Sequence, residues 1–245
     1  MKRTIIQRAG LVLGAVIGSL GLAIVPASAA KTAGAASGTS TADQARLQLI
    51  INRGNNEISR RLTTLTTLTA KINASAKLTD SDKATLSGEV SDETGSLTAL
   101  KAKLDADTTV ADAKADAQSI IDDYRVYALI VPKINLVKTA DDQQVAEGKL
   151  SDLAAKLQTR VTAAKAAGKN VTSLQNGLTT MNGKISAAQA ISSNIESGVV
   201  NLQPSDYNTN HSVLSGDRNQ LKTAQSDIQD AVKAASTIVN GLKTL

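Results

Sequence analysis

The chain has 245 residues, with no Cys, Trp or Phe and only three Tyr, which excludes disulfides, thiolate metal sites and an aromatic core. Its 27 Lys and Arg are interspersed with 22 Asp and Glu, a net charge of +5, and this pattern with so few aromatics argues against nucleic-acid binding. A core of Leu, Ile, Val and Ala in an Ala-, Leu-, Lys- and Asp-rich chain is typical of long helices packed side by side.

The first 30 residues have the composition of a secretory signal peptide. Three bases precede the apolar stretch Ala9–Val25, and the small residues after Pro26 predict cleavage after Ala29 or Ala30. An uncleaved anchor is the alternative, because about 17 apolar residues can just span a membrane. Removing this segment leaves 24 Lys and Arg against 22 Asp and Glu, a net of +2. We therefore expect an exported chain, secreted or held at the cell envelope, with little basic character.

Residues 31–42 are small, polar and without pattern, and we expect them to form a flexible linker. Helical periodicity begins at Asp43 and continues through a Thr-rich stretch at 62–69. That stretch repeats with a period of three, not the period of two of a strand, so a helix is predicted there. The predicted seam of this first helix is Leu47, Ile51, Gly54, Ile58, Leu65, Leu68 and Ile72.

A second helix is predicted to start after a tight turn, with Thr79 as its N-cap. Because the connection is short, the first two helices are expected to form an antiparallel hairpin. Thr109 and Asp112 stand at capping-box spacing and predict the start of a third helix. The predicted stripe of the second helix is Leu86, Val90, Leu97, Leu100 and Leu104.

The third helix runs into residues 120–138, the densest apolar stretch after the N-terminal segment. The apolar pattern continues across Pro132, although proline inside a helix loses one hydrogen bond and costs about 3 kcal/mol. A separate helix starting at Pro132 would have Val131 as a poor N-cap. One long helix kinked near Pro132 is therefore favoured over two separate helices.

Three further features complete the helical pattern. A seam from Leu150 leads to a stop at Gly168, Asn170 is predicted to cap the next helix, and a loop is predicted around 199–207. The last helix has the most regular three-four alternation of the chain, typical of a coiled coil. Its predicted inward positions are Leu214, Asp217, Leu221, Ala224, Ile228, Ala231, Ala235, Ile238, Leu242 and Leu245.

These elements predict an all-α fold of long antiparallel helices. Weak similarity between the halves at an offset of about 88 residues favours two three-helix, spectrin-like bundles that share the central helix kinked near Pro132. The first bundle is expected over residues 43–131 and the second over 132–245. One compact bundle of about five or six helices is the alternative.

Residue types of common catalytic and metal sites are scarce. His211 is the only histidine, and there is no G-x-S-x-G nucleophile motif. The stretch Asp105–Asp116 loosely resembles a calcium loop, but it lacks the required glycine and the final Glu. Acidic pairs at 122–123 and 141–142 are interpreted as solvated surface. The sequence therefore predicts no enzyme activity, no cofactor and no metal site.

The segments LTALKAKLDADT, YRVYALIVPK, NLQPSDYN and IVNGLKTL resemble a group of uncharacterised, signal-peptide-bearing helical proteins from candidate-phylum bacteria with reduced genomes. The resemblance covers most of the chain after the signal peptide. It implies an exported bacterial protein with a long helical region, and it carries no assigned activity.

The leading functional hypothesis is a non-enzymatic envelope-associated spacer or protein-interaction module with a protein partner on the cell envelope or surface. Self-association is compatible with it, whereas membrane contact after signal cleavage is not expected, because the apolar stripes are narrow and lack aromatics. The predicted partner-binding residues are Tyr124, Tyr127, Leu129 and Pro132. A carrier of a small apolar ligand between helices and a lipid-surface-binding helical protein are the alternatives.

Overall fold

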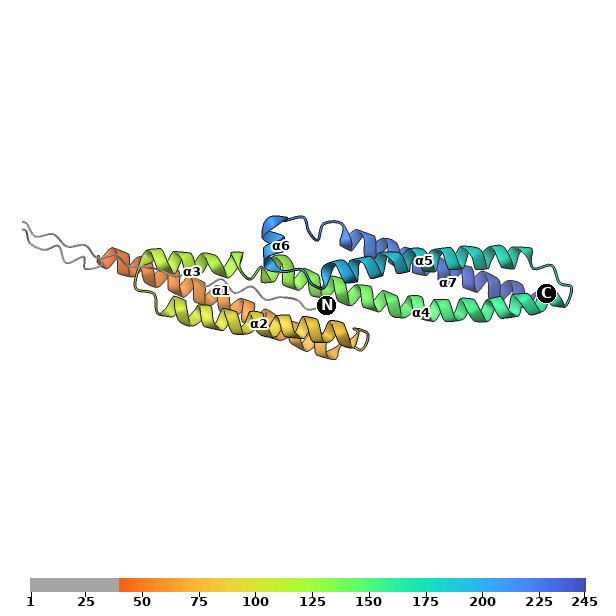
Figure 1. The fold of residues 1–245 in the computed structure, drawn as a ribbon, viewed down its shortest axis with the longest axis horizontal. Coiled ribbons are helices and arrows are strands. Elements are labelled where there is room, and N and C mark those ends of the chain that lie inside the picture. Colours follow the sequence, from red (N-terminus) through yellow and green to blue (C-terminus); the bar gives the residue numbers. More distant parts are fainter. Residues whose placement is uncertain (1–39) are drawn as a thin grey trace, which may run out of the picture. The chain divides into compact units, whose positions relative to one another are not determined.

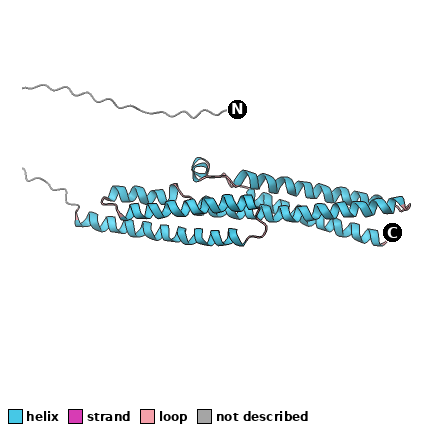
Figure 2. Ribbon diagram, turned by 60° about the horizontal axis from the view of Figure 1, so that its bottom comes forward, coloured by secondary structure: helices cyan, strands magenta, loops and turns pink. Residues whose placement is uncertain are grey.

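The computed structural model describes residues 40–245, so the predicted signal peptide and nearly all of the predicted linker lie outside it. Within this range the chain forms helices joined by turns and contains no strand (Figure 2). The predicted all-α class is confirmed. Among these helices, none is both long and apolar enough to cross a membrane. The elements are α1 (Thr41–Ala74), α2 (Asp80–Asp105), α3 (Val110–Asp122), a π-helical turn η1 (Val126–Ile130), α4 (Val131–Ala166), α5 (Thr172–Val199), α6 (Pro204–Thr209) and α7 (Asp217–Lys243).

The helices α1, α2 and α3 pack as one group (Figure 1). The predicted N-caps Thr79 and Thr109 are confirmed, since their hydroxyls accept hydrogen bonds from backbone N–H groups three residues on, at 3.0 and 3.1 Å. The predicted cap Asn170 is wrong by one residue, because the N-cap of α5 is Val171. Gly54 allows α1 and α2 to approach closely, because a Cβ at this position would overlap the Leu104 side chain. Every residue of the predicted α1 seam is buried.

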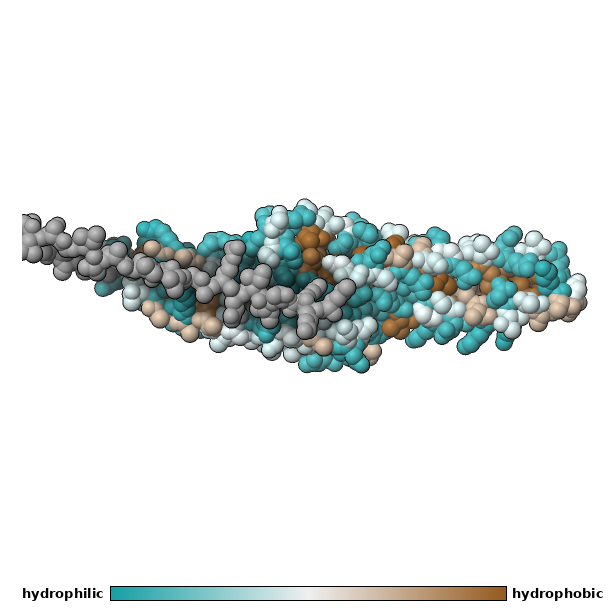
Figure 3. All heavy atoms as spheres, viewed as in Figure 1, coloured by the Kyte–Doolittle hydropathy of each residue, from teal (hydrophilic) through white to brown (hydrophobic). Residues whose placement is uncertain are grey.

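The helices α4, α5 and α7 form the second group and lie side by side along most of their length (Figures 1 and 2). Their buried residues form a second hydrophobic core that extends from Leu150 on α4 to Ile238 on α7. The first core continues beyond residue 131 and includes Ile134, Val137 and Ala140 of α4. The helix α4 therefore contributes to both cores. Outside these cores, the visible face in Figure 3 is mostly hydrophilic, with separate apolar patches.

The central helix is interrupted at 123–125, not kinked at Pro132 as predicted. The helix α3 ends at Asp122, and Arg125 has a left-handed backbone with φ 42° and ψ 32°. The chain then resumes as η1, where Ile130 N donates to Arg125 O at 3.3 Å, and continues directly into α4. Pro132 lies in the first turn of α4, directly after the π-helical turn η1, where a missing N–H is tolerated. The proline therefore needs no kink of its own.

Candidate functional site at the junction of the two helix groups

The short helix α6 makes hydrogen bonds that stabilise the break before η1. Arg125 Nε donates to Asn208 Oδ1 at 2.6 Å, and Arg125 Nη2 donates to Asp122 Oδ1 at 2.9 Å. Asn208 Nδ2 in turn donates to the backbone oxygen of Asp122 at 2.7 Å, which satisfies a carbonyl at the end of α3. The Arg125 guanidinium also lies 5.5 Å from the ring centre of Tyr207. The connection between α5 and α7 thus holds the strained turn in place.

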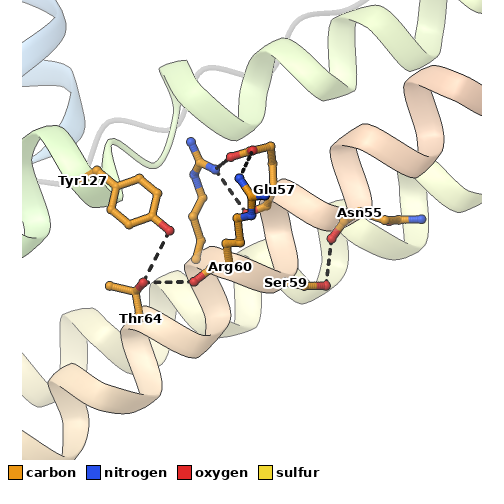
Figure 4. A network of polar contacts seen from close by, with 7 residues as sticks. Asn55, Glu57, Ser59, Arg60, Thr64 and Tyr127 are labelled. Atoms are coloured by element: carbon orange, nitrogen blue, oxygen red, sulfur yellow. Dashed lines mark hydrogen bonds and ion pairs between the residues drawn. The ribbon is translucent and has the colours of Figure 1, made fainter.

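Tyr127 lies on the outer side of the junction, against α1. Its side chain is half exposed, and its hydroxyl is 3.4 Å from the hydroxyl of Thr64 (Figure 4). The Arg61 guanidinium lies 5.1 Å from the ring centre and is itself held by Glu57, with an Nη1 to Oε2 distance of 2.7 Å. A buried arginine and a helix hydroxyl therefore fix the orientation of an exposed aromatic ring.

The exposed surface continues from Tyr127 onto α3. Ile121 is 46% exposed, and it lines the same shallow hollow of about 100 Å³ as Arg61, Arg125 and Tyr127. The exposed side chains of Ile121 and Tyr127 therefore lie beside two arginines that carboxylates already orient. We call Ile121, Tyr127, Arg61 and Arg125 the tyrosine face.

The other predicted partner-binding residues do not join the tyrosine face. Leu129 is fully buried in the first core, because it points inward from η1, and its side chain is not on the surface. Tyr124 packs against the same core, and burial raises the pKa of its hydroxyl, with a further rise from Glu93. Pro132 lines a different hollow, shared with α7. The structure thus distributes the four predicted residues among three environments.

A buried lysine joins three segments of the chain at the junction of the two helix groups. Lys133 is fully buried, and its Nζ donates to the Glu89 carboxylate of α2 and, at 2.6 Å, to the backbone oxygen of Leu202. Burial raises the pKa of Glu89 despite the opposing effect of Lys133. Burial, and then the negative charge of Glu89, raise the pKa of neighbouring Glu93 to about 7. Sequence reasoning missed this group, since its one signal is a lysine within the densest apolar stretch.

A second group of carboxyls lies where α2, α4 and α5 meet. Asp141 is 1% exposed, and its Oδ2 accepts a hydrogen bond from Thr79 N at 3.0 Å. Burial is the main cause that raises the pKa of Asp141 to about 6, with further rises from Asp82 and Glu196. The interpretation of the 141–142 pair as solvated surface was therefore wrong for Asp141. The adjacent Asp142 does reach solvent and pairs with Lys138 at 2.8 Å.

No protein-family model, curated protein or solved structure matches the chain. Within residues 40–245, no set of three or more His, Asp or Glu side chains is arranged to hold a metal ion. The fold and the junction define an all-α protein built from two groups of three long helices. The resemblance to exported helical proteins of candidate-phylum bacteria stays a prediction.

Proposed function

We propose that this chain is an exported, non-enzymatic helical protein that acts as an envelope-associated spacer or protein-interaction module. The tyrosine face is the observation that carries the proposal. Tyrosine is enriched among the residues that contribute most to binding between proteins. Arg61 and Thr64 already orient the Tyr127 ring, so a partner would lose little side-chain entropy on binding it.

The continuity of α4 supports the spacer part of the proposal. This helix has 36 residues, which corresponds to roughly 54 Å of uninterrupted α-helix. Its first part packs in the core with α1 and α2, and its later part packs in the core with α5 and α7. A helix that belongs to two cores couples their positions more firmly than a flexible linker would.

The buried ionisable groups support a structural role for the interior. Lys133 binds Glu89 and a backbone oxygen, and both oxygens of Glu147 accept from the Ser192 hydroxyl at 3.0 and 2.9 Å. These contacts join α4 to α2, to the segment after α5 and to α5 itself, and burial is the leading cause that raises the pKa of Glu89 and of Glu147. Structural pairing accounts for perturbed groups of this kind without a catalytic role.

Export depends on the N-terminal segment, which lies outside the described residues. The protein would be expressed with a C-terminal tag in a bacterial host and recovered from outside the cytoplasmic membrane for N-terminal sequencing. We expect a chain that begins at Ala30 or Lys31. Retention of Met1 in the recovered protein would argue for the uncleaved anchor.

The interaction is tested with a photo-crosslinking amino acid placed at Tyr127 in living cells. The matched control position is Val232 on α7, which is 51% exposed and lies in the second helix group. We expect one discrete adduct from position 127, strongly reduced by a second change, Ile121→Ser, and none from position 232. No adduct at 127, or equal adducts at both positions, would contradict the proposal.

A further inference from the structure

A hollow between α4 and the start of α7 has features that the interaction role does not explain. It has a volume of about 260 Å³, and Pro132, Leu136 and Leu221 supply its apolar lining. Pockets for drug-sized ligands are typically about 300–1,000 Å³, so this hollow suits a smaller molecule. It is open to solvent on the side of Asn135 and Thr139, which are both exposed.

Gln143 lines this hollow and carries an unsatisfied acceptor. The residue is 4% exposed, and its Nε2 donates to the backbone oxygen of Leu221 at 2.8 Å. Its Oε1 is buried and has no hydrogen-bond partner among the described residues. Leaving such an acceptor unpaired is unfavourable, and nearly all buried polar groups therefore have partners. Because this oxygen is buried, a donor from a bound molecule would reach and satisfy it only after the Gln143 amide turns toward the hollow.

The charges around the hollow favour an anion. Arg218 and Lys222 line it from the first two turns of α7, four residues apart on one helix face. Both are exposed, and neither forms an ion pair with a carboxylate in residues 40–245. The N-terminal end of α7 adds a partial positive charge close by. Asp217 belongs to the same turn but does not line the hollow.

We propose that this hollow binds a small amphipathic organic acid. The apolar body of the ligand would lie against Pro132, Leu136 and Leu221, with its carboxylate between Arg218 and Lys222. A hydroxyl or N–H of the ligand would donate to Gln143 Oε1. The apolar body and the carboxylate thus meet groups that already line the hollow, whereas the Gln143 amide turns to offer its oxygen. The inference concerns a different surface from the tyrosine face and does not depend on a protein partner.

Three probes separate the contributions of the charge and of the donor. Indole-3-acetate has an apolar ring, a carboxylate and an N–H donor, whereas 1-naphthaleneacetate lacks the donor and indole-3-ethanol lacks the charge. Isothermal titration calorimetry of the purified protein should find indole-3-acetate to be the tightest of the three. We expect each of the other two to bind about tenfold more weakly, the ratio that corresponds to about 1.4 kcal/mol.

Variants assign the binding to this hollow. Thr139→Trp fills it from an exposed position and should abolish binding of indole-3-acetate. Thr159→Trp, an exposed threonine farther along α4 with the same hydroxyl bond to the carbonyl four residues back, is the matched control and should bind normally. Circular dichroism should show equal helix content in both variants. Equal binding by both variants would overturn the proposal.

Two further variants test the individual groups. Gln143→Leu should remove the preference for indole-3-acetate over 1-naphthaleneacetate. Lys222→Gln should lower the affinity for indole-3-acetate and leave the affinity for indole-3-ethanol unchanged. Failure of the wild-type protein to bind indole-3-acetate at millimolar concentration would overturn the proposal, as would equal affinity for all three probes. Either failure leaves the crosslinking result at Tyr127 unaffected, so the two proposals are tested separately.

Discussion

Lys133 and Glu89 form an ion pair in which the lysine side chain is fully removed from solvent and the glutamate side chain is only 11% exposed. An isolated buried charge is costly, whereas a paired one can be nearly neutral in free energy. The pair joins α4 to α2, and the bond from Lys133 to the Leu202 carbonyl adds the segment that leads to α6. This one side chain thus links both helix groups.

Lys133→Met should therefore lower the free energy of unfolding by about 2–4 kcal/mol, because it leaves Glu89 and the Leu202 carbonyl without their donor. Urea unfolding followed by far-UV circular dichroism measures the change. The double variant Lys133→Met with Glu89→Leu should recover part of the loss. Lys101→Met, which removes an exposed pair with Asp105, is the control and should cost less than about 1 kcal/mol.

The raised carboxyl pKa values predict that the protein becomes less stable as the pH rises. Folding moves the pKa of Glu93 from 4.5 to about 7 and that of Asp141 from 3.8 to about 6. The folded state therefore binds more protons than the unfolded chain within these windows, so stability falls as the pH rises through them. Near Glu93 the relevant charges are Glu89, Asp92 and Lys133, of which only the lysine opposes the shift.

Thermal unfolding should thus occur at a higher temperature near pH 5 than near pH 8. Glu93→Gln should flatten this dependence and raise stability at the higher pH by about 1–2 kcal/mol, a value reduced from the full shift because Glu93 is partly exposed to solvent. Asp105 and Asp230 have lowered pKa values and act in the opposite direction, but they are exposed and paired with lysines on the surface. A stability that rises steadily from pH 5 to pH 8 would show that the carboxyls of Glu93 and Asp141 are not desolvated.

The contact between Arg125 and α6 predicts a local change in dynamics. Asn208→Ala removes the acceptor for Arg125 and the donor for the Asp122 carbonyl, so hydrogen exchange should accelerate in residues 204–209 and at the break. Pro132→Ala is the control, because Pro132 takes no part in these bonds, and exchange in α6 should not change. If Pro132→Ala accelerated exchange instead, the result would support the sequence-based prediction of a kink at Pro132.

Backbone strain at Arg125 is separated from its side-chain contacts by comparing two variants. Arg125→Ala and Arg125→Gly both lose the guanidinium, but only glycine adopts φ 42° without a steric penalty. The glycine variant should be more stable than the alanine variant by about 1 kcal/mol in urea unfolding. Equal stabilities would mean that the left-handed backbone relaxes once the side chain is removed.

Gly54 predicts how closely α1 and α2 pack. Gly54→Ala introduces a methyl group that overlaps Leu104, and we expect a loss of about 1–3 kcal/mol in the free energy of unfolding. Gly88 on α2 is the matched control, since it has open space around it, and Gly88→Ala should stabilise the helix by up to about 1 kcal/mol. A stabilising Gly54→Ala would contradict the close approach of these helices.

The seams were predictable from the sequence because apolar residues recur at helical spacing. The α1 series from Leu47 to Ile72 and the α7 series from Leu221 to Ile238 are buried as predicted. The prediction for the last helix extends too far, since α7 starts only at Asp217 and Leu245 is 38% exposed. Helix ends carry weaker periodic signals than helix interiors.

The break and the buried charges were not predictable in the same way. No glycine or proline marks residues 123–125, and the turn is held by Asn208, 83 residues later in the chain than its partner Arg125. Asp141 is an acid in a polar stretch, and nothing in its neighbours along the chain indicates that α2 and α5 cover it. Such features depend on contacts between distant segments, whereas periodicity reports only on one helix at a time.

The tyrosine face is the centre of the functional account, and the affinity of the crosslinked partner tests it most directly. The purified partner would be titrated with the wild-type protein, with Tyr127→Ala and with Val232→Ala, the exposed control on α7. The account predicts that Tyr127→Ala weakens binding about 30-fold, the effect of losing a hot-spot residue, while Val232→Ala binds like the wild type. Equal affinities for all three proteins would contradict it.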